Sequence, residues 1–336
     1  MNTEQGPSPL LTIAIVTRNR AALLRECLES LSRQTASFEW RAFVVDNASD
    51  DETFALASAF AKRDRRFTVY LELQLGASRA RNRATHEAVT PYVLFVDDEC
   101  TFPPGYIERA GSLIQANRPA CFGGPVLARF ACDPPRPSWY KESYGAFSLP
   151  ENNPPVGPAR LSAGNLGASR EALLTIGGFP ESFGPAGRQM VYGEENVVVT
   201  AMWRRYGPDA VLYDPDLFNR HLVRPEKYRW RTIFRESLRR GLARGRLKAH
   251  RLDHGAATHD SLATATRRRC ALCHIPQLIG GAVLDFTLLR RLTDPVRYPD
   301  IRNVVYERWT RYVTMFGVLI GYMRGRRETR SRKSTT

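Results

Sequence analysis

The sequence predicts an α/β fold, with helices on both faces of a mostly parallel sheet, followed by a basic helical extension. Two observations predict the sheet: four short apolar segments are typical of strands, and helical segments separate them along the chain. A third observation, the density of Lys and Arg in the last third, predicts the extension. The 336 residues, 43% of them hydrophobic, can form one large or two small domains with a substantial core.

The strands are expected in the first hundred residues. Residues 11–17, LTIAIVT, form a β-branched and apolar run, which is typical of a strand buried on both faces. Further strands are expected at residues 41–46, 67–73 and 92–97. Short apolar strands joined by helices favour parallel pairing, so the carboxyl ends of the strands should meet at one edge, where ligands bind.

Three helices are expected between these strands, at residues 21–34, 51–62 and 78–88. In the first of them, three leucines lie on one helical face at spacings of three and four residues: Leu24, Leu28 and Leu31. Long loops are expected at 103–158, which is rich in Pro, Gly and aromatic residues, and a second ordered block at 161–213.

Charge is distributed unevenly. The chain has 49 Lys and Arg against 34 Asp and Glu, a net charge of +15, which favours polyanionic partners such as nucleotides, nucleic acid or acidic lipid. From residue 221 onward there are 26 basic and 9 acidic residues, whereas the first 220 residues are nearly neutral. The excess positive charge therefore belongs to the extension.

The extension has two interpretations. Its basic run at 229–251 lies in the same part of the chain as two apolar runs, 275–289 and 312–323, both shorter than the ~20 residues of a membrane-spanning helix. We favour an interfacial helix that faces anionic lipid on the inner side of a membrane. The alternative is a solvated helix packed on the first domain.

Six cysteines and the polar start of the sequence, MNTEQGPSP, favour a reducing, cytoplasmic location. The segment Cys270-Ala271-Leu272-Cys273-His274 has the form of a haem attachment site. Because haem attachment requires export and no signal sequence is visible, two unrelated thiols are the better interpretation.

Polar residues follow three of the predicted strands. They are Thr17-Arg18-Asn19, Asp46-Asn47 and Asp97-Asp98-Glu99. Asx residues often only cap turns and helices, and each cluster alone is weak. Three consecutive carboxylates are more informative, because their mutual repulsion must be relieved by solvent, protons or a cation. Hard oxygen ligands suit Mg²⁺ or Mn²⁺ holding a diphosphate.

The segments LTIAIVTRNR, VVDNASDDET, LGASRARNRA and VLFVDDEC resemble the nucleotide-sugar-binding half of family 2 glycosyltransferases, which have the GT-A fold. The resemblance implies that 97–99 is the DxD motif, with Asp97 near the donor and Asp98 or Glu99 as the metal ligand. It also implies that Asp46, Asn47 and Arg81 bind the nucleotide. We assign Thr17 and Asn19 to the same donor site.

Two later segments extend the resemblance. Ser162-Ala163-Gly164-Asn165 is similar to the family's segment beneath the donor sugar, which implies that Gly164 and Asn165 line the donor site. Gly193-Glu194-Glu195-Asn196 is similar to its Glu-Asp motif, which implies that Glu195, beside Glu194, is the catalytic base. Acids at a helix N-terminus are the alternative explanation for this pair. His221 matches a histidine that helps to hold the metal or diphosphate.

The resemblance covers about residues 10–222 and implies an inverting glycosyltransferase. It would transfer a sugar from a UDP- or dTDP-sugar to an acceptor hydroxyl, with Mn²⁺ or Mg²⁺, in polysaccharide or glycoconjugate biosynthesis. The expected partners are the donor, a glycan or lipid-linked acceptor and an anionic membrane surface, with no nucleic acid. The expected parts are a catalytic domain at 1–222, whose donor half is 10–100 and acceptor half 101–222, and an extension at 223–336.

Two other functions stay open. A nucleotidyltransferase also uses an α/β sheet and metal-binding carboxylates, but the loop after the first strand, TRNRAALL, lacks the glycines typical of that class. A non-catalytic membrane-surface or nucleic-acid-binding protein on a degenerate transferase domain is the second alternative. It is suggested by Glu99, Glu195 and Val197, which depart from the family pattern.

Overall fold

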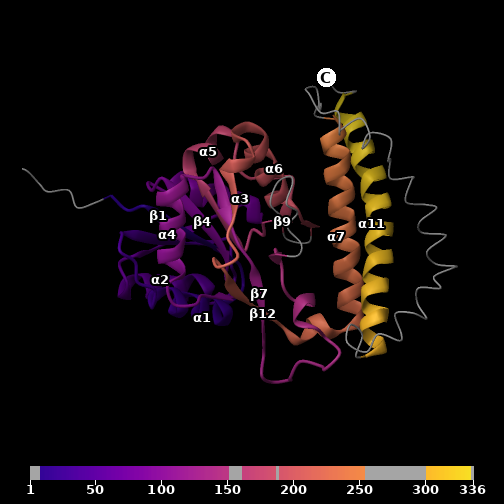
Figure 1. The fold of residues 1–336 in the computed structure, drawn as a ribbon, viewed down its shortest axis with the longest axis horizontal. Helices are drawn as coiled ribbons and strands as arrows, with labels where there is room; N and C mark the ends of the chain where they lie inside the picture. The colour runs from indigo at the N-terminus through magenta and orange to yellow at the C-terminus, as the bar shows by residue number, and fades with distance from the viewer. Residues whose placement is uncertain (1–7, 151–160, 187–188, 254–299, 334–336) are drawn as a thin grey trace, which may run out of the picture. The chain divides into compact units, whose positions relative to one another are not determined.

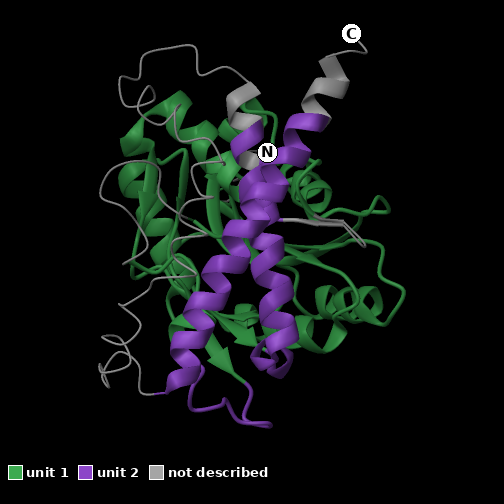
Figure 2. Ribbon diagram, turned by 90° about the vertical axis from the view of Figure 1, so that its right-hand side faces the viewer, with its two compact units in different colours: residues 1–130, 142–189, 194–223 green, residues 131–141, 190–193, 224–336 purple. Residues whose placement is uncertain are grey.

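The computed structural model describes residues 8–150, 161–186, 189–253 and 300–333 (Figure 1). They fall into two compact units, coloured separately in Figure 2. Unit 1 comprises residues 1–130, 142–189 and 194–223, and unit 2 comprises 131–141, 190–193 and 224–336.

Unit 1 is built on a seven-stranded sheet. In spatial order the strands are β11 (Val211–Tyr213), β6 (Cys121–Gly123), β8 (Asn165–Ser169), β4 (Tyr92–Asp97), β1 (Leu11–Thr17), β2 (Trp40–Asp46) and β3 (Phe67–Leu71). The strand β1 runs parallel to both of its neighbours, β2 and β4, and β3 runs parallel to β2, whereas β8 runs antiparallel between β4 and β6.

The helices of unit 1 cover both faces of this sheet. They are α1 (Ala21–Ser32), α2 (Thr53–Arg63), α3 (Ala77–Glu87), α4 (Tyr106–Asn117), α5 (Arg170–Thr175) and α6 (Glu194–Tyr206). Buried residues of α1, α2 and α4 pack on one face, and those of α3, α5 and α6 pack on the other. The predicted α/β fold with a mostly parallel sheet is therefore confirmed.

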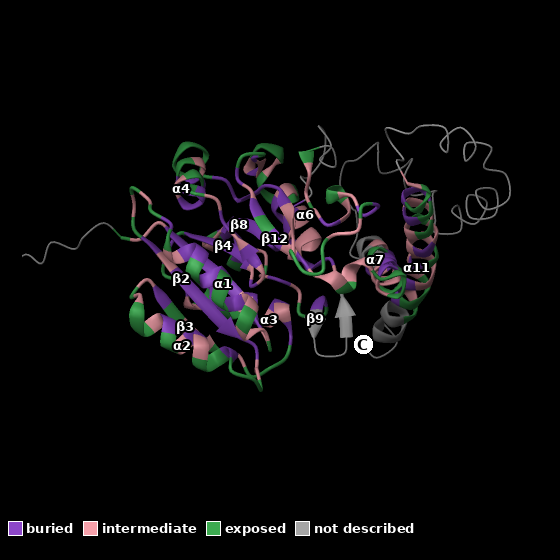
Figure 3. Ribbon diagram, turned by 90° about the horizontal axis from the view of Figure 1, so that it is seen from below, coloured by how far each residue is buried: buried purple, intermediate pink, exposed green. Residues whose placement is uncertain are grey.

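The two-sided burial explains why β1 is apolar along its length. Ile13 and Ile15 face the first layer of helices, whereas Ala14 faces the second, and none of the three is exposed. The predicted leucine stripe of α1, which includes Leu24 and Leu28, packs into the first of these two cores. Figure 3 shows the same burial along the neighbouring strand β2.

A second, three-stranded sheet lies in the same unit. It consists of β5 (Cys100–Thr101), β12 (Asn219–Val223) and β7 (Val126–Phe130), in the order β5-β12-β7. The pairing of β12 with β5 sets His221 opposite Cys100. His221 thus lies beside the acidic end of β4, although it comes more than a hundred residues later in the chain.

Short elements complete the described chain. The strands β9 and β10 occupy Gly184–Ala186 and Gln189–Val191. Single turns of 3-10 helix occupy Glu142–Tyr144, Pro208–Ala210 and Pro225–Tyr228.

Unit 2 is dominated by two long helices, α7 (Trp230–Asp253) and α11 (Ile301–Lys333). Two short segments, residues 131–141 and 190–193, also belong to this unit. The sequence predicted that both would belong to the first domain. Aromatic and polar contacts explain the difference. Trp139 stacks on Trp230 with ring centroids 5.2 Å apart, and the Tyr192 hydroxyl lies 3.0 Å from Glu236 Oε2.

The α7 and α11 helices run parallel and touch along glycines spaced four residues apart. Gly241 and Gly245 of α7 face Gly317 and Gly321 of α11. A Cβ atom at any of these positions would lie 2.1 to 2.6 Å from a backbone carbonyl oxygen of the partner helix. The glycines therefore set the spacing of the two backbones.

The close contact between α7 and α11 accounts for part of the apolar run at 312–323. The other apolar run, 275–289, and the CxxCH segment at 270–274 lie outside the described residues. Within the described part of the chain, no helix combines the length and the hydropathy needed to cross a membrane.

We expect Gly321→Ala to destabilise unit 2, although alanine is a better helix former by about 1 kcal/mol. The added Cβ would lie 2.1 Å from the Leu242 carbonyl oxygen, and overpacking of this kind costs about 1–3 kcal/mol. Denaturant unfolding followed by tryptophan fluorescence measures the effect. Met323→Ala, at an exposed position of the same helix, is the control, and equal stability of the two variants would contradict the close packing.

Candidate active site

The parallel register brings the three polar strand ends together. Thr17 pairs with Asp46 across β1 and β2, and Val16 pairs with Asp97 across β1 and β4. Because these strands end at the same edge, the sequence clusters predicted to share a site do lie side by side. The edge is the position at which ligands bind to open parallel sheets.

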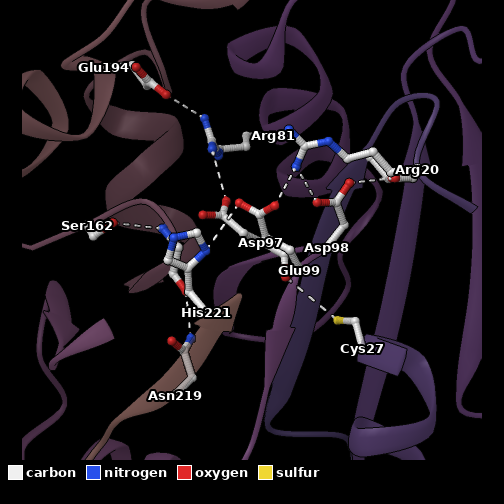
Figure 4. Close-up of polar contacts among 12 residues, drawn as sticks. Arg20, Cys27, Arg81, Asp97, Asp98, Glu99, Ser162, Glu194, Asn219 and His221 are labelled. Atoms are coloured by element: carbon white, nitrogen blue, oxygen red, sulfur yellow. Dashed lines mark hydrogen bonds and ion pairs between the residues drawn. The ribbon is translucent and has the colours of Figure 1, made fainter. Parts of the chain in front are cut away.

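Asp98 turns into the protein interior. Only 3% of the residue is exposed. The Thr17 hydroxyl donates to Oδ2 at 2.7 Å, and Arg20 Nη1 donates to Oδ1 at 2.9 Å (Figure 4). Burial raises the pKa of Asp98 to about 6, although Arg20 and Thr17 stabilise the charged form. Both oxygens of this predicted metal ligand are thus already bound by the protein.

Asp97 and Glu99 lie apart from Asp98. The side chain of Asp97 is 43% exposed, and its Oδ1 is 3.9 Å from Arg81 Nη2. Gly164 leaves room for this carboxylate, because a Cβ there would lie 2.5 Å from Asp97 Oδ2. The side chain of Glu99 is 10% exposed and lies between Arg20 and His221: its Oε2 is 3.4 Å from Arg20 Nη1, and its Oε1 is 3.2 Å from Nδ1 of His221.

His221 is held by its strand and by an aromatic neighbour. It is 7% exposed, and its ring lies 5.6 Å from that of Phe147. Its Nδ1 makes no hydrogen bond to any residue that the structure describes, despite the proximity of Glu99. A buried ring nitrogen in this state is available as a ligand or as a hydrogen-bond partner.

These donors were tested for their fit to a divalent cation. In the described part of the chain, no three His, Cys, Asp or Glu side chains form a complete metal-ligand cluster. The carboxylates of Asp97 and Glu99 and the imidazole of His221 nevertheless provide the donor chemistry that Mn²⁺ or Mg²⁺ accepts, with oxygen predominating. The residues therefore match such a cation in donor chemistry, and a complete set of ligands would need further donors from a substrate.

Arg81 of α3 links the acidic strand end to α6. Its Nη1 donates to Glu194 Oε1 at 2.8 Å, and both side chains are less than one-tenth exposed. A charge buried this deeply is stable only when it is paired, so Arg81 and Glu194 hold each other in place. Figure 4 shows the guanidinium between Glu194 and Asp97.

Glu195 follows Glu194 in the first turn of α6, as a helix N-terminus favours. Burial and the adjacent charge of Glu194 raise the pKa of Glu195 to about 8. Its carboxyl thus holds a proton more strongly than an ordinary glutamate does, which is a property expected of a group that exchanges a proton. Asn196 Nδ2 donates to its Oε1.

Several residues predicted to bind the donor form hydrogen bonds within the protein. Asn47 donates to the Glu72 and Gln74 carbonyls and accepts from the Gly76 amide. Asn19, in a left-handed backbone conformation with φ of 54°, accepts from the Asp50 amide. These two side chains fix the loops around the site.

Asn165 and Asp46 are both fully buried. Asn165 accepts from the Tyr106 hydroxyl and donates to the Pro125 and Leu217 carbonyls, so its amide is fully used. Asp46 accepts the Ser49 amide through Oδ1, and its Oδ2 makes no hydrogen bond to a described residue. Asp46 therefore keeps one acceptor atom for a ligand.

Sequence reasoning missed two residues that shape the site. Arg20 contacts Asp98 and lies 3.4 Å from Glu99 Oε2, and Asn219 donates to the Gly164 carbonyl at 2.7 Å. The signal for Arg20 was present, since a buried carboxylate needs a cation and the loop after β1 supplies two arginines. Asn219 gave no comparable signal.

Comparison with known families matches residues 12–177 to the model described as glycosyl transferase family 2. A PGL/p-HBAD biosynthesis glycosyltransferase of Mycobacterium bovis is 30% identical over 115 residues, which are 34% of this chain and 44% of that relative. Glycosyltransferase AglE of Haloferax volcanii is 24% identical over 175 residues, 51% of this chain and 56% of the relative. The chain thus aligns with about half the length of these curated relatives.

Two solved structures are similar in fold. The mannosyltransferase PcManGT from Pyrobaculum calidifontis, in complex with GDP-Man and Mn²⁺, has a TM-score of 0.61 at 18% identity, over 95% of this chain and 88% of its own. GalNAc-T7 with UDP, GalNAc and Mn²⁺ has a TM-score of 0.50 at 14% identity, over 77% of this chain and 53% of its own. The likeness confirms the predicted GT-A fold.

We expect the stability of the chain to fall as the pH rises towards 8, because Glu195 must then ionise in a buried position beside Glu194. A carboxyl whose folded pKa is raised from 4.5 to about 8 favours the folded state fully below pH 4.5 and loses this contribution as the pH rises through 8. Glu195→Gln should therefore melt higher than the natural chain at pH 9.

Thermal unfolding between pH 4 and 9 measures this effect, with Glu39→Gln, an exposed carboxylate on unit 1, as the control. Glu194→Gln should move the fall in stability to lower pH, since it removes the neighbouring charge. A melting profile of Glu195→Gln that parallels the natural chain would contradict the raised pKa.

Proposed function

The chain belongs to glycosyl transferase family 2, and we propose that it transfers a sugar from a nucleoside-diphosphate donor to an acceptor hydroxyl with inversion at the anomeric carbon. One observation carries the proposal. The Glu194–Glu195 pair, Arg81 and the exposed carboxylate of Asp97 meet at the carboxyl edge of a parallel sheet, although they come from segments far apart in the sequence.

The reaction would be a single displacement. Glu195 accepts the proton of the acceptor hydroxyl, whose oxygen forms a bond to the anomeric carbon while the bond to the diphosphate breaks. The nucleoside diphosphate leaves with the bonding electron pair. The raised pKa of Glu195 supports this assignment, because a base with a pKa near the working pH takes up a proton effectively.

Arg81 is the fixed positive charge nearest to Asp97 and Glu194. Arg81 pairs with Glu194, whereas no arginine among the described residues forms an ion pair with Glu195. We therefore assign proton transfer to Glu195 and the positioning of Arg81 to Glu194.

The donor is proposed to be a UDP- or dTDP-sugar. Asp46 supports a nucleotide at this edge, because its buried Oδ2 is an acceptor suited to a hydroxyl or ring N–H group of the ligand. PcManGT binds GDP-Man and GalNAc-T7 binds UDP, so the diphosphate is the part that the two ligands share. The proposed acceptor is a glycan or another glycoconjugate.

Asp97, Glu99 and His221 are the residues that would hold Mn²⁺ or Mg²⁺. The chemistry that the cation supplies when bound is neutralisation of the charge that grows on the leaving diphosphate. Both solved structures named above contain Mn²⁺, which supports the same requirement here.

We expect Glu195→Gln to lower kcat by about a hundredfold or more, since this is the usual effect of losing a general base. The KM for the donor should change little, because the substitution keeps the shape of the side chain. Steady-state release of nucleoside diphosphate from UDP- and dTDP-sugars, with Mn²⁺ and a panel of acceptor glycans, measures both constants. An inactive Glu194→Gln beside an active Glu195→Gln would mean that the base is Glu194.

The same assay separates the alternative functions. A nucleotidyltransferase would release no nucleoside diphosphate from these donors, but it would release pyrophosphate when given a nucleoside triphosphate and a sugar 1-phosphate. A non-catalytic protein would release neither product. Hydrolysis of the donor without an acceptor would still support a transferase site, because water then replaces the acceptor hydroxyl.

We expect the chain to bind UDP or dTDP more tightly in Mn²⁺ than in EDTA, and Glu99→Gln or His221→Gln to remove most of this difference. Isothermal calorimetry measures it directly. Glu26→Gln, a surface carboxylate paired with Arg129, is the control. Equal affinities in EDTA and in Mn²⁺ would contradict the metal requirement without affecting the assignment of Glu195.

A further inference from the structure

The first turns of α7 and α11 enclose a hollow of about 370 Å³. Most of its lining is apolar and comes from both helices, which run parallel at this end of the pair (Figure 1). The apolar lining residues are Trp230, Ile233, Phe234, Val305, Trp309 and Val313.

Four of these side chains are also open to solvent. Trp309 is 57% exposed, Phe234 48%, Trp230 41% and Val305 38%. Single exposed apolar residues are ordinary on protein surfaces, but four around one hollow form a continuous patch. Such a patch is typical of a surface that contacts an apolar partner.

The charge around the patch is mostly positive, although Glu226, just before α7, is exposed and Asp300, just before α11, pairs with Arg302. In residues 229–249 and 301–327, every exposed charged residue whose burial the structure describes is an arginine; examples are Arg231, Arg235 and Arg311. The two acidic residues in these ranges are partly buried and bonded. Glu236 contacts Tyr192 and Arg239, and Glu307 contacts Lys141.

We propose that this end of the α7/α11 pair docks on an anionic membrane surface. Trp230, Phe234 and Trp309 would enter the boundary between headgroups and acyl chains, where tryptophan is favoured, and the arginines would face lipid phosphates. The helices would lie on the membrane, since no described helix meets the requirements for crossing one.

The composition of the patch favours lipid over nucleic acid. Both partners carry phosphates that attract arginine, and aromatic rings can stack on bases. The aliphatic lining by Ile233, Val305 and Val313, however, offers no stacking surface, whereas it matches an acyl chain. This inference does not depend on the transferase activity, and its failure would leave that proposal intact.

Flotation of the full chain on a density gradient tests the docking. The chain should float at low salt with vesicles of phosphatidylcholine and phosphatidylglycerol in equal parts, and it should stay at the bottom with phosphatidylcholine alone. Failure to float with the anionic vesicles would overturn the proposal. Binding to RNA in a filter assay without flotation would assign the patch to nucleic acid instead.

A double variant and a matched control test whether the apolar patch contacts the lipid. Phe234→Ser combined with Trp309→Ser should weaken binding to the anionic vesicles by roughly tenfold or more, since each removes an exposed aromatic ring. Phe54→Ser, on α2 of unit 1 with a 41% exposed ring, is the control and should float like the natural chain. Equal flotation of the double variant and the control would exclude this face.

A measurement on the natural chain does not depend on the folding of any variant. Brominated lipids in anionic vesicles should quench tryptophan fluorescence, because Trp230 and Trp309 are exposed whereas Trp40 and Trp139 are only 5% exposed. Flotation without quenching would mean that the arginines attach the chain and the aromatic patch stays outside the lipid.

Discussion

A buried negative charge at the end of β4 sets the arrangement of the whole site. Asp98 lies between β4 and the loop that follows β1, and its carboxylate is held by Arg20 and by the Thr17 hydroxyl. The strand ends at Asp97, whose side chain is 43% exposed, whereas Asp98 in the following turn points inward. The same arginine lies 3.4 Å from Glu99, so it contacts both acidic residues of this turn. The consequence is that the three carboxylates, adjacent in sequence, have different electrostatic environments.

The central strands were predictable because their signal is local. The bounds of β1 and β4 agree with the predicted ranges, and β2 and β3 differ by one or two residues at one end. A strand buried on both faces must be apolar throughout, and that pattern is visible in any short window. The pairing of β12 with β5 left no such pattern, because it joins residues more than a hundred positions apart. The contact between His221 and Glu99 depends on that pairing, so the sequence alone could not show that the two residues meet.

The roles of individual site residues were harder to predict from the sequence than the strands were. The resemblance implies that Asn47 and Asn165 line the donor site, and in the structure their amides also bond to backbone groups of neighbouring loops. Residue type cannot distinguish these roles, since an asparagine side chain is an equally good partner for a loop and for a ligand. Burial separates them only when the fold is known. Asp46 shows the contrast, because one of its buried oxygens has no hydrogen bond to the described residues.

The two glutamates of α6 show how the family pattern and the local electrostatics combine. A glutamate occupies the position where the resemblance implies an aspartate, and charge repulsion between adjacent carboxylates raises the cost of ionising both. Arg81 stabilises the charge of Glu194 by direct contact, so the cost falls on Glu195. A proton acceptor needs a carboxylate whose proton affinity is raised, and a positioning group needs one whose charge is permanent. One arginine on α3 thus gives two neighbouring residues of the same type different electrostatic environments.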